Sequence, residues 1–181
     1  MFKSKIQTTF LFMNSAEAAD LSKIYTEIKN ENRDWNQVLE SIISYFDCST
    51  GTLHFLNQES GLLKLEAQKG IPPFLIPKLE TIPVGKGMAG IAAERKEAVE
   101  MCNLQTDDSG VARPAAKETK VEGSIAAPML LNEKLYGTLG VAKPVPYDFT
   151  DKEKSDARKI IKEKELIEKK TNFKSYITMS I

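Results

Sequence analysis

The fold is decided by the stretch GSIAAPMLLNEKLYGTLGVAK, residues 123–143. It contains two mainly apolar runs, 124–131 and 135–143, which are separated by the polar residues 132–134. Runs of this length, joined by a few polar residues, are typical of two antiparallel strands. We therefore expect a hairpin here, with a sheet built around it.

A second hairpin is expected upstream of the first. It joins two β-rich runs, TLHFLN at 52–57 and LLKLEA at 62–67, through the turn residues 58–61. A further short strand is expected over 98–101. Because only short segments connect these strands, the sheet is expected to be mostly antiparallel, since parallel strands need long crossover connections.

Three amphipathic helices are expected near the two ends of the chain. The first covers 15–29, the second follows Asp34 as its N-cap, and the third runs from Thr150 to about Lys170. The third opens with a capping-box signature, in which Glu153 lies three residues after Thr150. The first two show apolar residues at helical spacing: Leu21, Ile24, Tyr25 and Ile28, then Trp35, Val38, Leu39, Ile42, Ile43 and Phe46.

The order of these elements predicts an α+β fold. The chain runs through two helices, a hairpin, short helical insertions at 74–79 and 88–95, a strand, a polar loop over 105–122, a hairpin and a closing helix. We expect the terminal helices to cover one face of the sheet, and the insertions and the loop to cover the other. Such an arrangement encloses a pocket between the sheet and the loop.

The composition bounds the class of protein. The 181 residues carry 25 basic and 25 acidic side chains, so the clustered basic excess of a strong nucleic-acid binder is missing. No apolar run reaches the about 18 to 20 residues that cross a bilayer, so we expect a cytoplasmic protein without a membrane partner. One domain is expected over 15–170, with an N-terminal extension over 1–14 and a tail over 171–181.

The sequence offers few groups for metal or nucleophilic chemistry. His54 is the one histidine, and Cys48 and Cys102 are the two cysteines. A structural zinc site needs four ligands in paired short spacings, so no metal site is expected. We expect His54 to be partly buried, and either satisfied by a neighbour or facing the helix layer; a haem ligand or a hydrogen-bond donor in the pocket are its alternatives. Cys48 is expected in the core, and Cys102 in the core or at the sheet edge, with a redox-sensitive thiol as the alternative for Cys102.

Several local motifs, in this order, resemble those of a GAF domain, a small-molecule-sensing relative of the PAS fold. They are IPVGKGMAG at 82–90, EAVEMCNL at 97–104, the hairpin 123–143, and FTDKE at 149–153. Together with the upstream hairpin, the resemblance covers about residues 20–168. It implies a central sheet with a ligand pocket, and terminal helices that pair with a second protomer.

The signature of cyclic-nucleotide-binding GAF domains is incomplete here. Those domains carry Asn-Lys, then Phe, then Asp-Glu, and the matching positions are Ala142, Lys143, Phe149, Glu153 and Lys154. Ala142 and Lys154 depart from the pattern, which argues against a cyclic nucleotide. Lys143 and Glu153 are kept, and we expect them to form a structural salt bridge between the last strand and the last helix.

Two other branches of the family rely on cysteines that this sequence lacks. The bilin-binding signature has a cysteine beside a histidine in the loop helix, and residues 103–122 contain neither type. Free methionine-(R)-sulfoxide reductase is similar through GKGMAG, but a cysteine of its members falls on Ala89, and residues 109–118 hold no thiol. Cys102 lies at a different position, at the end of the expected strand. Without a thiolate nucleophile a sulfoxide is not reduced, so we expect no enzymatic activity.

We therefore expect a non-catalytic GAF sensory module that binds a small molecule and signals through dimerising terminal helices. The sequence leaves the ligand and any cofactor unknown; a homodimer and an output protein acting in trans are the expected partners. Two alternatives stay open: a redox enzyme related to the reductase that uses Cys102, and a degenerate GAF scaffold for dimerisation. The pocket is expected to be lined by Phe55, Met88, Met101, Val111, Ile125, Ala127 and Val141.

Overall fold

The computed structural model describes residues 15–112 and 114–162. The expected extension 1–14, the tail 171–181 and the expected end of the last helix near Lys170 lie outside these residues. The helices are α1 (Ser15–Lys29), α2 (Trp35–Tyr45), α3 (Ile76–Leu79), α4 (Gly87–Arg95), α5 (Pro114–Lys117) and α6 (Asp151–Ile161), with 3₁₀ turns η1 (Pro73–Leu75) and η2 (Leu104–Thr106). The strands are β1 (Thr50–Asn57), β2 (Leu62–Lys69), β3 (Thr81–Pro83), β4 (Val99–Met101), β5 (Ser124–Leu131) and β6 (Lys134–Ala142).

The six strands form one antiparallel sheet in the order β3-β2-β1-β6-β5-β4. The two expected hairpins, β1–β2 and β5–β6, meet at the centre of the sheet, where β1 pairs with β6. This arrangement confirms the α+β class and the antiparallel sheet. It also makes β1, β6 and β5 the three neighbouring strands from which any central site on either face must be built.

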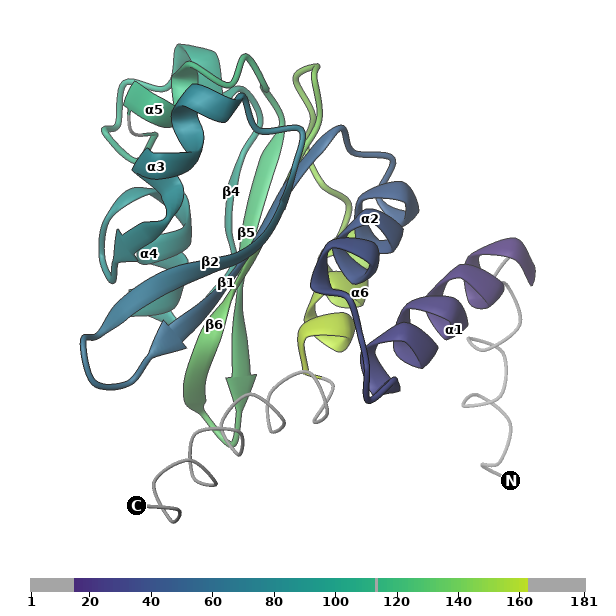
Figure 1. The fold of residues 1–181 in the computed structure, drawn as a ribbon. Coiled ribbons are helices and arrows are strands. Elements are labelled where there is room, and N and C mark those ends of the chain that lie inside the picture. The colour runs from purple at the N-terminus through teal and green to yellow at the C-terminus, as the bar shows by residue number, and fades with distance from the viewer. Residues whose placement is uncertain (1–14, 113, 163–181) are drawn as a thin grey trace, which may run out of the picture.

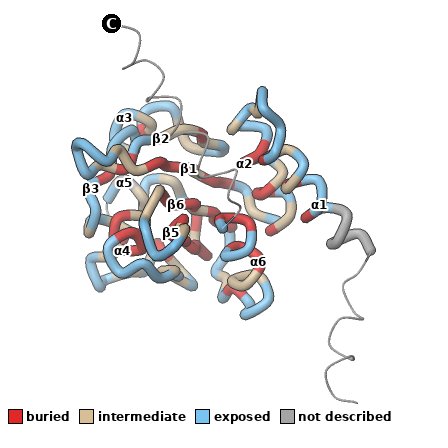
Figure 2. The backbone as a smooth tube through the Cα atoms, turned by 90° about the horizontal axis from the view of Figure 1, so that it is seen from below, coloured by how far each residue is buried: buried red, intermediate tan, exposed pale blue. Residues whose placement is uncertain are grey.

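The helices lie on both faces of the sheet, in two groups (Figure 1). Helices α1, α2 and α6 cover one face, with α1 outermost, whereas α3, α4 and α5 lie on the other. The expectation that the terminal helices cover one face and the insertions and loop the other is thus confirmed. Figure 2 shows that the buried residues concentrate along β1, β5 and β6 and on the inner sides of α2 and α6.

The hydrophobic core lies between the sheet and the terminal helices. Trp35 at the start of α2 packs edge-on against Phe55 of β1, with ring centroids 5.3 Å apart. The largest side chains that are fully buried here come from all three helices and from both hairpins: Ile24, Ile28, Leu39, Ile42, Leu53, Met129 and Ile160. Burial of such side chains contributes roughly 1.5 to 3 kcal/mol each, so this layer is the main source of stability.

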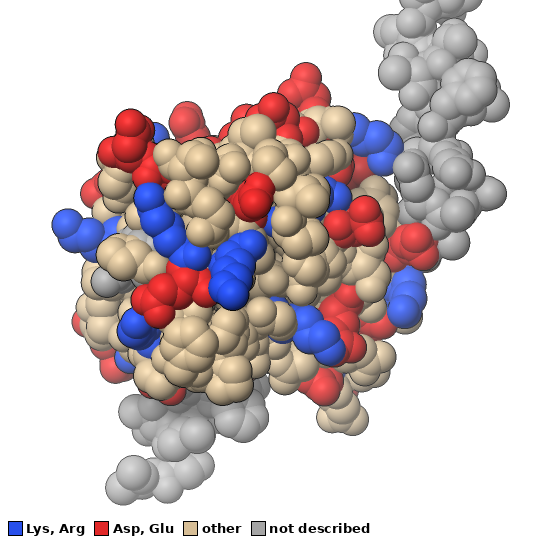
Figure 3. Space-filling model, turned by 90° about the horizontal axis from the view of Figure 1, so that it is seen from above, with Lys and Arg blue, Asp and Glu red and all other residues tan. Residues whose placement is uncertain are grey.

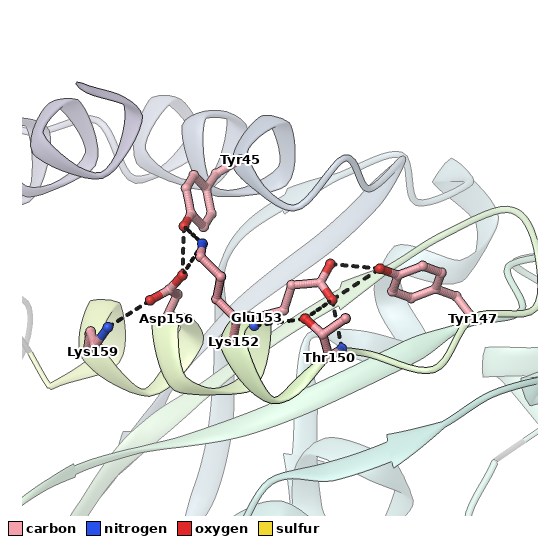
Figure 4. Close-up of polar contacts among 7 residues, drawn as sticks. All are labelled: Tyr45, Tyr147, Thr150, Lys152, Glu153, Asp156 and Lys159. Atoms are coloured by element: carbon pink, nitrogen blue, oxygen red, sulfur yellow. Dashed lines mark hydrogen bonds and ion pairs between the residues drawn. The ribbon is translucent and has the colours of Figure 1, made fainter. Parts of the chain in front are cut away.

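Helices α2 and α6 begin where the sequence predicts and are tied to each other. Asp34 Oδ1 accepts a hydrogen bond from Asn36 N at 2.9 Å, which caps α2. Thr150 and Glu153 form the predicted capping box at the start of α6. Between the two helices, Tyr45 Oη donates to the buried carboxylate of Asp156 at 2.8 Å (Figure 4).

Asp156 is a buried carboxylate in the helical layer. Burial alone would raise its pKa, but hydrogen bonds from Lys159, Tyr45 and Lys152 outweigh that effect and lower it. The same burial and the bond to Asp156 raise the pKa of Tyr45 to about 12. Both groups therefore keep one protonation state across the physiological range and hold α6 against α2.

Candidate functional site

A cavity of about 470 Å³ opens on the face of the sheet opposite the core. It lies between the central strands, the α3 and α4 segments, and the loop that contains η2 and α5. Its lining residues are Thr50, Gly51, Thr52, His54, Ile71, Lys78, Leu79, Ile82, Lys86, Gly87, Met88, Ala89, Leu104, Pro114, Ala116, Glu118, Thr119, Val121, Ser124, Ile125, Ala126, Gly140, Val141 and Ala142.

The floor of the cavity is a regular grid set by the strand register. Thr50 of β1 and Ser124 of β5 both pair with Ala142 of β6, and Thr52 and Ala126 both pair with Gly140 in the next row. Because side chains two residues apart on a strand share a face, all six positions face the cavity together. The floor therefore has a column of hydroxyl groups on β1 beside a shallow column of small residues on β6.

Gly140 keeps the middle of the floor low. A Cβ placed on this residue would meet Thr52 Oγ1 at 3.2 Å and otherwise only ordinary contacts, so the glycine leaves room above the sheet. Gly137, on the same strand, differs: a Cβ there would lie 2.1 Å from His54 O. Gly137 is thus required by close backbone packing, whereas Gly140 shapes the cavity.

His54 lies in the next position along the same face of β1. It is 1% exposed, and its Nε2 lies 3.0 Å from Leu79 O at the end of α3. Since a carbonyl only accepts, Nε2 carries the proton and Nδ1 is an acceptor, and Nδ1 has no partner among the described residues. Burial lowers the pKa of His54, so the ring is neutral at physiological pH.

The roof is formed by α4 and by the loop between β4 and β5. Lys86 is the N-cap of α4, and Gly87, Met88 and Ala89 of its first turn line the cavity. The chain reaches this helix through the Gly85 turn, where φ is +84°, a conformation that glycine adopts without strain. The first turn of α4 therefore presents backbone N–H groups beside the cavity without a side-chain cap.

The loop over 103–122 has an internal frame of hydrogen bonds. Asp107 Oδ2 accepts from Ala112 N at 2.8 Å, and Asp107 O accepts from Lys117 Nζ at 2.5 Å. Bonds from Ser109 and from Ala112 lower the pKa of Asp107. At the other end, Gln105 Nε2 donates to Val121 O at 2.6 Å. These bonds hold the loop in a defined course over the cavity.

Three charged residues lie at the rim. Lys78 Nζ and Glu118 Oε1 form an ion pair at 3.0 Å, and Lys86 is exposed. The buried lining residues, by contrast, are uncharged. In Figure 3, which views the molecule from the side of α3 and α5, basic and acidic side chains are interspersed over this face. The entrance thus carries mixed charge and the interior is neutral.

The residues expected to line the pocket are distributed over both faces of the sheet. Met88 lines the cavity, as do Ile125 and Val141, although the latter two also belong to the core cluster under the helices. Phe55 and Ala127 lie in that core cluster. Among the described residues, the cavity lining does not include Met101 or Val111.

The cavity residues that the sequence analysis missed are mostly small or polar. Thr50, Thr52, Ser124 and Gly140 lie on the cavity face because their strand neighbours at alternate positions enter the core. The signal was the alternation itself: the odd positions of β1 and β5 are more apolar, and they face the helices. The expectation of an apolar lining favoured the odd positions of β1 and β5, where Phe55 and Ala127 lie in the core cluster.

Lys143 and Glu153 each contact other groups, and not each other as the expected salt bridge would require. Lys143 Nζ donates to Phe46 O at 2.6 Å and to Asp47 O at 3.0 Å, because the end of α2 leaves carbonyl groups that favour a cation. Glu153 closes the capping box of α6 (Figure 4). Tyr147 lies between them: its ring is 4.4 Å from Lys143 Nζ, and its Oη donates to Glu153 at 3.1 Å.

Both cysteines are free, and neither lines the cavity. Cys48 packs against the core as expected, and burial raises its pKa to about 12, so its thiol is not nucleophilic. Cys102 is exposed, which corrects the favoured expectation that it packs in the core or at the sheet edge. It lies just after the edge strand β4, where the chain turns away to the surface.

Two other classes of site receive no support from the described part of the chain. Residues 15–112 and 114–162 contain no cluster of three or more histidine, cysteine or carboxylate side chains that would suit a metal ion. Within the same residues no helix has the length and hydropathy of a membrane span.

The fold and the cavity together define an α+β domain, with three helices on one face of its sheet and a cavity on the other. The family model that describes the GAF domain matches residues 35–155, and the chain belongs to the GAF family. Among curated protein sequences, none is similar enough to count as a match.

Solved structures share this fold at low sequence identity. The GAF domain of a phosphoenolpyruvate-protein phosphotransferase from Coxiella burnetii has a TM-score of 0.72 at 18% identity, covering 88% of this chain and 96% of that one. The corresponding Acinetobacter domain gives 0.69 at 19%, covering 85% and 92%. Free methionine-R-sulfoxide reductase from Neisseria meningitidis, solved with its substrate, gives 0.67 at 17%, covering 86% and 92%. The neighbours thus include a sulfoxide reductase and GAF domains that are parts of phosphotransferases.

Proposed function

We propose that this chain is a non-catalytic GAF module that binds a small molecule in the cavity on the far side of the sheet. The observation that carries the proposal is the cavity. Its volume of about 470 Å³ lies within the range of ligand pockets, about 300 to 1,000 Å³. A mainly apolar lining with a few hydroxyl groups and one imidazole is also typical of such pockets.

The chemistry of the lining supports binding over catalysis. Among the described lining residues there is no cysteine, and the one titratable group in the interior, His54, is neutral and bonded to Leu79. The hydroxyl group of Ser124 donates to Glu122 O at 3.4 Å, with no general base shown beside it. A nucleophile needs an adjacent base or a lowered pKa, and neither accompanies these groups.

The cavity floor is also connected to the helical layer through strand β6. Strand β6 carries Gly140 and Ala142 on the floor and continues into Lys143, which contacts the two main-chain carbonyls that directly follow α2. A ligand that shifts this end of β6 alters the support of α2, and we propose this as the path of the signal. Its proposed recipients are a second copy of the chain and an output protein acting in trans.

A cavity-filling variant tests the proposal. Ala126→Leu places a larger side chain on the floor, whereas Ser44→Leu makes a similar change at an exposed position of α2. A metabolite library is screened with the unmodified protein by thermal shift and ligand-observed NMR. We expect at least one compound to bind, and Ala126→Leu, but not Ser44→Leu, to abolish its binding. A screen without hits, or a hit that binds Ala126→Leu equally well, contradicts the proposal and favours the dimerisation scaffold.

A further inference from the structure

One wall of the cavity is fixed to the sheet. Helix α3 forms this wall, and its last residue, Leu79, accepts the hydrogen bond from His54 Nε2 at 3.0 Å. The next carbonyl, that of Glu80, accepts from Leu65 N of β2 at 2.9 Å. Two successive main-chain carbonyls therefore hold the end of α3, and with it Lys78, against the neighbouring strands.

The opposite wall is a short segment that is bonded mainly within its own loop. We call residues 114–121 the flap; it contains α5. Its bonds run to the preceding part of the loop, through Lys117 Nζ to Asp107 O and through Val121 O to Gln105 Nε2. None of these bonds reaches α3, so they set the course of the flap without fixing it to the other wall.

An ion pair joins the two walls. Lys78 Nζ lies 3.0 Å from Glu118 Oε1, and the two side chains are 52% and 40% exposed. Both residues line the cavity. Helices α3 and α5 lie next to each other at the same end of the molecule (Figure 1). Among the residues that the structure describes, the polar contact that joins the flap to α3 is this ion pair.

We propose that the Lys78–Glu118 ion pair is a latch that holds the flap closed over the cavity. When the pair is broken, the flap opens more often and ligand exchange becomes faster. The latch rests on the proposed function only in that the enclosed space is a ligand cavity. An exposed pair of this kind biases an equilibrium by about 1.5- to 5-fold, which is enough to tune access without blocking it.

Amide exchange measures the latch without any ligand. The amides of Glu118, Thr119 and Lys120 donate to main-chain carbonyls within the flap. NMR hydrogen exchange of these amides is compared between the unmodified chain and Lys78→Glu. We expect exchange in Lys78→Glu to be about 1.5- to 5-fold faster, and the swapped variant Lys78→Glu/Glu118→Lys to return to the original rate. At about 0.5 M salt the unmodified chain should approach the single variant, because salt screens exposed pairs.

A second exposed pair provides the matched control. Lys69 of β2 and Glu40 of α2 form an ion pair with side chains 54% and 52% exposed, away from the cavity. Lys69→Glu makes the same charge reversal and should leave the exchange of the flap unchanged. Unchanged exchange in Lys78→Glu, an equal rise in Lys69→Glu, or no recovery in the swapped variant would each overturn the proposal.

A neutral dye gives a second readout and separates the two proposals. N-Phenyl-1-naphthylamine is bound to each variant, and its release rate is measured by stopped-flow fluorescence. We expect release to be faster in Lys78→Glu by the same factor as amide exchange, and unchanged in Lys69→Glu. Release that stays unchanged in Lys78→Glu contradicts the latch. If the dye does not bind the unmodified chain, that result counts against the ligand cavity, and the amide exchange alone decides the latch.

Discussion

His54 combines two roles at the residue scale. Its Nε2 holds the end of α3, and its ring forms part of the cavity lining. The sequence analysis expected a partly buried histidine, satisfied by a neighbour or facing the helix layer, with a place in the pocket as an alternative. The structure buries it fully, bonds it to Leu79 and places it on the cavity face instead of the helix face. Burial of the ring disfavours the imidazolium and lowers the pKa of His54, so the stability of the fold depends on pH through this residue.

The free energy of unfolding should fall as the pH drops below about 6.5. The pKa of His54 is lowered in the folded state, so between the folded and unfolded pKa values the unfolded chain binds a proton that the folded chain does not. Stability therefore rises with pH in this window, by at most about 1.4 kcal/mol per pH unit for one group. Urea unfolding of the unmodified chain and of His54→Gln between about pH 5 and 7.5 measures this. Since the chain has one histidine, equal slopes for the two proteins would refute the assignment.

The cysteines lead to a second prediction at this scale. Cys48 is half-buried with its pKa raised to about 12, and Cys102 is exposed outside the cavity. Reduction of a sulfoxide needs a thiolate next to the bound substrate. We expect no turnover of free methionine-(R)-sulfoxide in an NADPH-coupled assay with thioredoxin. Turnover that disappears in Cys102→Ser and persists in Cys48→Ser would make the chain an enzyme.

At the scale of elements, local signals placed most of the helices and five of the six strands, missing the short β3, but they did not determine the faces of the strands. The caps at Asp34 and Thr150 are carried by two or three neighbouring residues, so the sequence is sufficient to find them. The direction in which β1 faces depends on which layer packs on it, and TLHFLN offers apolar side chains on both sides. Lys143 and Glu153 likewise form contacts that depend on the end of α2, which is distant in sequence.

The capping box of α6 should make a measurable contribution to stability. Thr150 Oγ1 accepts from Glu153 N at 3.2 Å, and Thr150 N donates to Glu153 Oε2 at 2.8 Å. Replacing Thr150 by Ala removes the side-chain acceptor and leaves an N–H group of the first turn unsatisfied. We expect a loss of roughly 0.5 to 2 kcal/mol in urea unfolding. Ser44→Ala, at an exposed position of α2, should change stability by less than about 0.5 kcal/mol. Equal losses would show that the cap contributes nothing specific.

At the scale of the whole molecule, the two faces of the sheet serve different purposes. The large side chains gather under α1, α2 and α6, whereas the other face carries small and polar residues under a roof of short helices and loop. The family and the placement of the terminal helices on one face of the sheet were predictable, because the order of the motifs and the helical periodicity can be read from the sequence. Met88, Ile125 and Val141 of the cavity were expected, but its small and polar strand residues were not, because the choice of strand face depends on which side chains pack into the core.

The last prediction concerns the association of two chains. The sequence analysis expected a dimer through the terminal helices from the family resemblance, but apolar residues of these helices are buried within one chain: Ile24 and Ile28 of α1, and Ile160 and Ile161 of α6. A contact between two chains through the terminal helices must therefore use the outer sides of these helices or residues outside the described ranges. A truncation that tests the dimer must therefore keep Ile160 and Ile161, because these two residues belong to the core of one chain.

Truncation after Lys162 keeps the described core and tests the same idea. We propose that the full-length chain forms a homodimer, with twice the chain mass of 20.2 kDa, through its terminal helices. Light scattering at about 100 μM protomer should give the doubled mass for the full chain and the single mass after the truncation, with unchanged circular dichroism. A monomeric full-length chain at this concentration would refute the dimer. A dimer that survives the truncation would place the interface outside residues 163–181.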